Sequence, residues 1–233
     1  MLIADTKSSK QALEAPADKD RALVTFVGRH GIVALSHVMA ALDVRRAAAY
    51  RRVARLREAG LIEWVQVFIS RSYLRATRQG LRYAGLDMPV AQLSAASLEH
   101  SLRCATVAQR LERKLGPGSV LSERDVALAE ALEQREIACA VLGTPSKPRR
   151  HRADLAILGE EGTIAVEVEL MAKAPRRLVA IIRAWRLAVA CGLVREVHYL
   201  CEPGKTYRAV QRAVGSVQAE GCVQVIELKG GSR

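Results

Sequence analysis

The chain has 233 residues, half of them hydrophobic, which suffices to bury a core and excludes a disordered polypeptide. Its 36 Lys and Arg residues against 24 Asp and Glu give a formal net charge of +12. A surplus of this size favours a polyanionic partner, either nucleic acid or an anionic membrane. No apolar run approaches the roughly 18 residues that a membrane-spanning helix needs, so we expect no membrane-spanning helix.

The N-terminal segment and the cysteines indicate in which cellular compartment the protein is expected. Residues 1–18 have no apolar stretch behind a basic start, so we expect a flexible tail rather than a signal peptide. The five cysteines are scattered and form no C-x-x-C pair, which predicts neither a disulfide framework nor a zinc site. Both features indicate a cytoplasmic protein.

The positive charge is concentrated near the N-terminus. Residues 21–85 contain twelve arginines against three acidic residues, a surplus of nine positive charges. Because no hydrophobic anchor accompanies this charge, we expect DNA or RNA as the partner and no membrane. The alternative is a surface charge that serves only solubility, but acids would then be interspersed among the arginines.

Three helices are predicted in this basic segment. Residues 21–29 show helical spacing of apolar side chains, and Gly31 follows their end. Ser36 is expected to cap a second helix and Asp43 a third, which Gly60 ends. Two capped helices joined by a short turn predict a helix-turn-helix.

Two β-like runs follow the third helix. Residues 61–68 and 72–77 are separated by a short connection at 69–71, which predicts a hairpin wing. The pattern A-x-x-x-V-x-x-L-x-x-x-G-L-I, which begins at Ala49, resembles the recognition helix and first wing strand of bacterial winged-helix proteins. We therefore predict a winged helix-turn-helix over residues 19–90 that binds double-stranded DNA.

The expected recognition helix presents arginines on its outer face. With Ala49, Val53 and Leu56 toward the core, the other positions can contact guanine in the major groove or clamp a phosphate. This face lacks Asn and Gln, so we expect mainly phosphate contacts and modest specificity. Tyr50 can belong to the core instead. The predicted DNA-binding residues, one of them at the wing tip, are Arg45, Arg46, Tyr50, Arg51, Arg52 and Arg71.

A long amphipathic helix is predicted over residues 92–115. We assign residues 91–117 as a linking helix, which also offers a surface for a homodimer. His100 stands alone on this helix with no partner nearby in sequence, so a structural or solvent-facing role is favoured.

The C-terminal part, residues 118–233, alternates helices and strands. A helix-like stretch and a basic loop around Lys147 precede a hairpin that turns at Glu-Glu-Gly. A helix from Pro175, a strand, a second helix and a last strand follow. This order predicts a mixed-sheet α/β domain, making the whole chain α+β, with a parallel strand–helix–strand unit at the end.

Three carboxylates are expected to meet on the hairpin. The period of two in TIAVEVEL puts Glu167 and Glu169 on the face opposite Val166 and Val168. Asp154 begins the neighbouring strand, and three such oxygen ligands suit Mg²⁺. The alternative is that the glutamates only form ion pairs with arginines of the next helix, which are Arg176, Arg177 and Arg183.

Asp154, followed across the hairpin by Glu167-Val168-Glu169 and a helix, resembles the PD-(D/E)XK nuclease core. The stretches H-R-A-D-L-A-I and A-V-E-V-E-L-x-x-K, with a winged helix before them, also resemble the replication-relaxation family of actinobacterial plasmids and integrated elements. That resemblance covers nearly the whole chain beyond residue 20. It implies a restriction-endonuclease-like domain, a role in plasmid replication or relaxation, and Asp154 and Glu167 as metal-binding acids.

The chain departs from the nuclease motif at two positions. Ala153 replaces a proline, and Glu169 replaces the usual lysine, whose charge Lys173 can supply from a shifted position. Glu123 is a candidate for a further metal acid. In an active enzyme Asp154 and Glu167 would ligate Mg²⁺, Glu169 or Lys173 would position water, and Arg177 would hold a phosphate.

Two functions follow from these patterns. The favoured one is a DNA-binding protein of a plasmid or integrated element, associated with the nucleoid or plasmid, that acts in replication, relaxation or transcriptional control. The second is a Mg²⁺-dependent endonuclease or nickase delivered by the winged helix. A protein-interaction adaptor fits the basic charge poorly.

Overall fold

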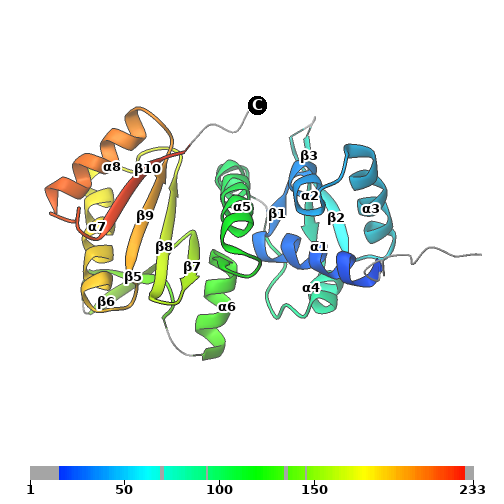
Figure 1. Cartoon of the computed structure of the whole chain (residues 1–233), viewed down its shortest axis with the longest axis horizontal. Helices are drawn as coiled ribbons and strands as arrows, with labels where there is room; N and C mark the ends of the chain where they lie inside the picture. Colours follow the sequence, from blue (N-terminus) through cyan, green and yellow to red (C-terminus); the bar gives the residue numbers. More distant parts are fainter. Residues whose placement is uncertain (1–15, 69–70, 93, 134–135, 145, 229–233) are drawn as a thin grey trace, which may run out of the picture.

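The computed structural model describes residues 16–68, 71–92, 94–133, 136–144 and 146–228 (Figure 1). The expected tail therefore lies mostly outside the described residues, although the first helix already begins at Pro16. Within the described part the chain is a mixed α and β protein, so the predicted α/β fold class is confirmed. None of the helices in these ranges is long and apolar enough to cross a membrane.

The N-terminal part has the element order of a winged helix. Its three strands form one antiparallel sheet in the order β1-β3-β2, with β2 and β3 as the predicted hairpin. The elements are α1 (Pro16–His30), β1 (Ile32–Val33), α2 (Leu35–Leu42), α3 (Arg46–Glu58), β2 (Ile62–Phe68), β3 (Arg71–Ala76) and α4 (Arg78–Ala84).

The predicted caps of α2 and α3 are wrong. The N-terminal cap of α2 is Ala34, whose N–H donates to the His37 ring Nδ1 at 3.0 Å, so a histidine takes the place expected for Ser36. Asp43 ends α2 in a left-handed conformation, with φ of 50°, and α3 begins only after Arg45. A short polar side chain tolerates this conformation, which explains why aspartate marks the end of one helix and not the start of the next.

The C-terminal part is a five-stranded mixed sheet between helices. Its strand order is β10-β9-β8-β7-β4, in which β7 runs antiparallel to both neighbours and β8, β9 and β10 are parallel. The elements are β4 (Val120–Ser122), α6 (Glu123–Glu133), β7 (Leu155–Gly159), β8 (Gly162–Glu169), α7 (Pro175–Ala190), β9 (Glu196–Cys201), α8 (Lys205–Ser216) and β10 (Val223–Glu227).

A two-stranded ribbon, β5 (Cys139–Thr144) and β6 (Lys147–Arg152), packs over α7. The segment expected to be a basic loop is therefore a strand, β6. Its cross-strand hydrogen bonds to β5 override the low strand propensity of its charged residues, as tertiary context often does.

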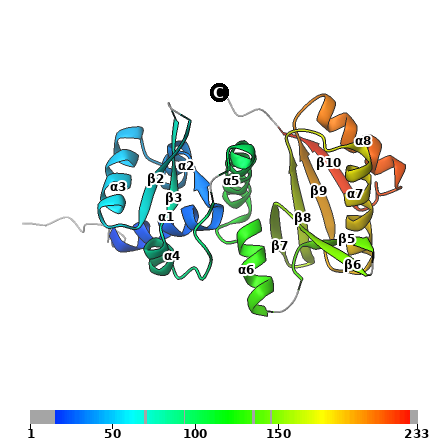
Figure 2. The same cartoon turned by 180° about the vertical axis from the view of Figure 1, so that it is seen from behind.

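Helix α5 (Ala95–Leu115) lies between the two parts of the molecule (Figures 1 and 2). Its N-terminal half packs Leu98 against β1 and β3, and its C-terminal half packs Val107 and Ala108 against β4, β7 and β8. The other face of that sheet is covered by α7 and α8. The apolar stripe expected to serve a homodimer is thus used inside the chain. Helix α5 packs into the cores of both parts, so its packing does not assign it to either one. The domain boundaries predicted at residues 90 and 118 therefore stay predictions.

Ion pairs reinforce this junction. Arg29 at the end of α1 donates from Nε to Asp125 Oδ2 of α6 at 2.7 Å, and its Nη1 lies 3.3 Å from Glu112 of α5. Burial lowers the pKa of Arg29, but the charges and hydrogen bonds of Asp125 and Glu112 together outweigh it, so the pKa is raised overall. Arg124 adds hydrogen bonds to the Gly28 and Pro89 carbonyls. These contacts join the winged helix to α5 and α6.

Candidate nucleic-acid interface and carboxylate site

Helix α3 buries one face and exposes the other. Ala49, Val53 and Leu56 are at most 2% exposed and pack in the core, as their spacing predicts. Tyr50 is 43% exposed, so it lies on the outer face and not in the core. The exposed arginines on and beside α3 are Arg45, Arg46, Arg51, Arg55 and Arg57.

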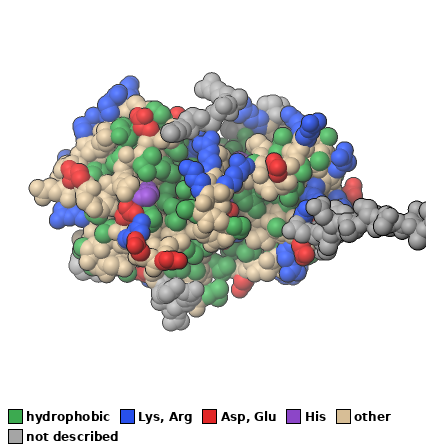
Figure 3. Space-filling view, viewed as in Figure 1, with side chains coloured by type: hydrophobic (Ala, Val, Ile, Leu, Met, Phe, Trp, Pro, Cys, Tyr) green, Lys and Arg blue, Asp and Glu red, His purple; other side chains and the backbone are tan. Residues whose placement is uncertain are grey.

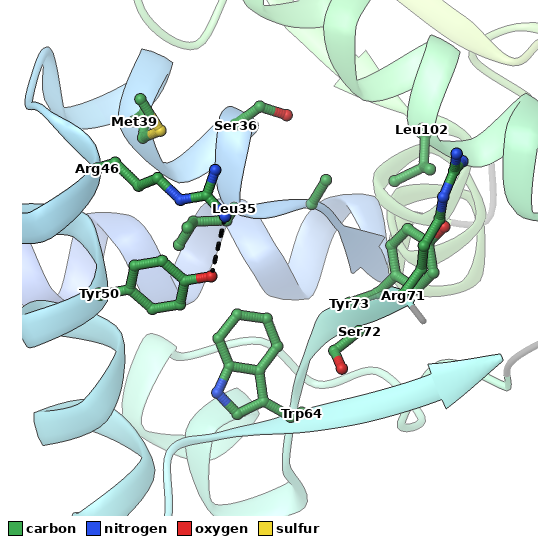
Figure 4. Close-up of a pocket in the computed structure, with 11 residues that line it drawn as sticks. Leu35, Ser36, Met39, Arg46, Tyr50, Trp64, Arg71, Ser72, Tyr73 and Leu102 are labelled. Carbon is green, nitrogen blue, oxygen red and sulfur yellow. Dashed lines mark hydrogen bonds between the residues drawn. The ribbon is translucent and has the colours of Figure 1, made fainter. Parts of the chain in front are cut away.

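An open groove of about 790 Å³ runs between α3, the start of α2 and the wing strands (Figure 4). Tyr50 and Arg46 enter it from α3, and Trp64 enters it from β2. The Arg46 guanidinium lies 5.5 Å from the centre of the Tyr50 ring, and the Tyr50 and Trp64 ring centres are 6.2 Å apart. Arg71, at the start of β3, lines the groove as well. The groove therefore combines aromatic faces with two guanidinium groups.

Most arginines of the basic segment have no acidic partner in the ranges that the structure describes. Among the residues that the structure describes, ion pairs engage four of the twelve, which are Arg29, Arg52, Arg55 and Arg75. The eight without an acid within ion-pair distance in those ranges are Arg21, Arg45, Arg46, Arg51, Arg57, Arg71, Arg78 and Arg82. Figure 3 shows Lys and Arg side chains along the outer edge of the winged-helix part. An excess of unpaired guanidinium groups on one module favours an external polyanion.

Arg52 differs from its neighbours on α3. Its Nη1 donates to Asp20 Oδ1 of α1 at 2.8 Å, and Arg55 binds the same carboxylate. The sequence places Arg52 on or beside the outer face, but its charge is compensated within the protein. The wing tip itself, residues 69–70, lies outside the described residues, and Arg71 follows it with an exposed side chain.

The β8 strand alternates as predicted. Val166 and Val168 point to the α5 side, whereas Ala165 points to the side covered by α7. Glu167 and Glu169 share this second side and are only 2% and 3% exposed. Charged side chains this deeply buried require partners, since an unpaired buried charge is costly.

Glu167 is held by two side chains. Its Oε1 accepts hydrogen bonds from Trp185 Nε1 of α7 at 3.0 Å and from His151 Nε2 of β6 at 2.9 Å. Burial raises the pKa of Glu167, and the charge of Asp154 raises it further, while the bond to His151 lowers it. The pKa of His151 is raised overall: burial lowers it, but the hydrogen bond and charge of Glu167 outweigh this effect.

Glu169 pairs with Lys173, one of the predicted catalytic residues, through Oε2 and Nζ. The expectation that the two glutamates pair with Arg176, Arg177 or Arg183 is wrong within the described ranges. The reason is geometric: these arginines are exposed on α7, whereas the glutamates lie beneath it.

Asp154 lies on the turn between β6 and β7. Its Oδ2 accepts from the Val168 N–H at 2.7 Å, and its Oδ1 lies 2.9 Å from His100 Nε2. Its backbone carbonyl accepts from the N–H of Glu123, which places that further candidate acid at the same site. The pKa of Glu123 is raised by burial and by the charge of Asp154.

The contact between His100 and Asp154 was missed by sequence reasoning. The two residues are 54 positions apart, and His100 seemed to have no partner. Cys104, one helical turn further along α5, places its Sγ 3.5 Å from His100 Nε2. The only signal in the sequence is the i, i+4 spacing of His100 and Cys104, which puts both on one helix face.

The magnesium site expected at Asp154 and Glu167 stays a prediction, and the donor atoms that lie nearest Asp154 include a nitrogen and a sulfur. In the described part of the chain, the one group of three metal-ligating residues with donor atoms within 4.8 Å of one another is His100, Cys104 and Asp154. Glu167 and Glu169 are instead engaged by His151, Trp185 and Lys173. Magnesium prefers a shell of oxygen ligands, which a histidine nitrogen and a cysteine sulfur do not supply.

A buried hydroxyl completes the carboxylate site. Tyr199 of β9 pairs in register with Glu167, and its side chain is fully buried. Within the described part of the chain its hydroxyl has no hydrogen-bond partner. Burial, followed by the charges of Glu167 and Glu169, raises its pKa well above the ordinary value. This site thus gathers carboxylates, two histidines, a lysine and a tyrosine from five elements.

No family model matches the chain, and no curated protein was found that resembles it in sequence. The resemblance to the replication-relaxation family therefore stays a prediction.

Proposed function

We propose that this chain binds double-stranded DNA through α3 and the wing. The observation that carries the proposal is a set of exposed arginines on these elements that have no ion-pair partner among the described residues: Arg45, Arg46, Arg51 and Arg71. Two of them, Arg46 and Arg71, line the groove. Helix α3 has the position of a recognition helix in a winged helix-turn-helix. Its exposed residues are long cations suited to phosphate and guanine contacts.

Arg46 and Arg71 lie on different elements of the same groove, so a phosphate backbone along it would meet positive charge from α3 and from the wing. Tyr50 and Trp64 offer flat apolar surface beside them. Arg52 is expected to contribute less to DNA binding, because Asp20 already neutralises part of its charge.

Duplex binding by single-residue variants tests the proposal. Arg51→Ala and Arg46→Ala should each weaken binding and reduce the slope of log affinity against log salt by about 1, the effect of one lost phosphate contact. Arg195→Ala is the matched control, since Arg195 is an exposed arginine of the α/β part that already pairs with Glu161 and Glu196. Binding that is insensitive to salt, or equal losses in all three variants, would refute the proposal.

On this proposal the protein serves a plasmid or integrated element, in replication, relaxation or transcriptional control, and associates with the plasmid or nucleoid. The support for this role is the order of elements that the replication-relaxation family implies: a winged helix, then a hairpin with Asp154 and Glu167, then a helix.

Phosphodiester cleavage at the carboxylate site is the second candidate function. The observation in its favour is that the N–H of Val168, which stands between the buried Glu167 and Glu169, donates to Asp154 Oδ2 at 2.7 Å, and that Lys173 pairs with Glu169. Supercoiled plasmid incubated with Mg²⁺ or Mn²⁺ should be nicked by the wild type and left intact by Asp154→Ala/Glu167→Ala. Plasmid that is bound but uncut by both proteins would reject this second function and leave the first untouched.

A further inference from the structure

His100, Cys104 and Asp154 bring a nitrogen, a sulfur and an oxygen donor together where α5 meets the start of β7. The His100 Nε2 lies 2.9 Å from Asp154 Oδ1 and 3.5 Å from Cys104 Sγ, and all three donor atoms lie within 4.8 Å of one another. A tetrahedral metal ion with bonds of about 2.0–2.3 Å separates its ligand atoms by roughly 3.3–3.7 Å. Shifts of about an ångström or less would therefore suffice to enclose an ion.

The chemistry of the three donors selects the class of metal. Imidazole and thiolate are ligands for zinc and related divalent transition metals, and a carboxylate completes such sets in many zinc sites. Calcium and magnesium prefer oxygen alone. The set thus favours a metal different from the Mg²⁺ that the sequence suggests for Asp154.

Acidic and hydrogen-bonding groups surround the three donors. The backbone N–H of Glu123 donates to the Asp154 carbonyl at 3.0 Å, which brings a further acidic residue beside the donors. The other carboxylate oxygen of Asp154 is fixed by the Val168 N–H at 2.7 Å, an outer-shell contact of the kind that orients a metal ligand.

Access to the site is open on one side. The His100 side chain is 38% exposed, whereas that of Asp154 is 16% exposed. An ion could enter past His100, and a fourth coordination position would face water.

We propose that His100, Cys104 and Asp154 bind one zinc-class divalent ion per chain, with three protein ligands and a fourth position open to water. The ion ties α5, the helix shared by both cores, to the turn before β7. The proposal does not depend on DNA binding.

Titration of the chelator-treated full chain with Co²⁺ and Zn²⁺ tests the site. We expect one equivalent of Co²⁺ with the absorption of a cobalt–thiolate bond, displacement by Zn²⁺, and no competition from equimolar Mg²⁺. Cys104→Ser should abolish the thiolate absorption, and His100→Gln should weaken Zn²⁺ binding at least about 100-fold, since even outer-shell changes cost 10–100-fold.

Cys222→Ser is the matched control, because Cys222 is a half-buried thiol at the far edge of the sheet, beside β10. It should bind both metals like the wild type. Zinc should raise the melting temperature of the wild type and of this control, but not of His100→Gln, which tests the site even if the thiol variant folds poorly. Unchanged Zn²⁺ affinity in His100→Gln, or thiolate absorption lost in Cys222→Ser and kept in Cys104→Ser, would overturn the proposal.

Discussion

His30 provides a sensitive test of how the winged helix packs. It ends α1, is 9% exposed, and its ring centre lies 4.7 Å from that of Phe26. Burial, together with the charge of Arg29, lowers the pKa of His30 from 6.5 to about 3. The folded protein therefore keeps this histidine neutral at pH values where the unfolded chain protonates it.

The sign of the pH effect follows from this depressed pKa. The contribution of the neutral His30 to the free energy of unfolding is fully present above about pH 6.5. It is lost as the pH falls toward 3, because over this range only the unfolded state takes up the proton. Each pKa unit corresponds to about 1.4 kcal/mol, so between about pH 7.5 and pH 5 the free energy of unfolding should fall by about 2 kcal/mol.

Urea unfolding at both pH values, on the wild type and on His30→Phe, isolates this contribution. The variant keeps an aromatic ring beside Phe26 but does not titrate, so the two proteins should differ by about 2 kcal/mol in their pH dependence. Other ionisable groups are common to both proteins and cancel in the comparison. Equal pH dependence would refute the burial argument for His30.

Two further predictions concern stability at neutral pH, both measured by urea unfolding. Asp125→Ala should lower the free energy of unfolding by about 2–4 kcal/mol, because Arg29 loses its main partner at the junction of α1 and α6. A decrease below about 0.5 kcal/mol would show that this junction contributes little to stability. Gly80→Ala should cost about 2 kcal/mol or more, since its Cβ would lie 1.9 Å from the Leu61 carbonyl oxygen. Gly221→Ala, which meets no atom within 4 Å, should be nearly neutral, and equal losses in the two glycine variants would contradict the steric explanation.

Patterns that repeat along the chain predicted the secondary structure well. Helical spacing placed Ala49, Val53 and Leu56 in the core, and the period of two placed Glu167 and Glu169 on one side of β8. These features succeed because local geometry alone decides which side chains share a face.

Contacts between distant segments could not be predicted in this way. Nothing local indicates that Arg52 meets Asp20, or that His100 meets Asp154, because these pairs form only when separate elements pack. The predictions of the caps of α2 and α3 failed for a related reason. His37 accepts a hydrogen bond at the start of α2 and Asp43 ends that helix, and several residue types can fill either role. The sequence therefore predicted that Glu167 and Glu169 share one side of β8, but not the side chains that bind them.

We propose that the surface of α3 and the wing, and not the overall positive charge, binds DNA. Two variants of equal net charge separate these explanations: Arg45, Arg46, Arg51 and Arg71 changed to Ala, or the exposed arginines Arg176, Arg177, Arg208 and Arg212 of α7 and α8 changed to Ala. Duplex affinity is measured for both and for the wild type between about 50 and 200 mM salt. We predict that the first variant loses most of its affinity and about 4 units of salt slope, while the second binds like the wild type. Equal losses in both variants would show that overall charge governs binding, and a loss only in the second would place the DNA-binding surface on α7 and α8.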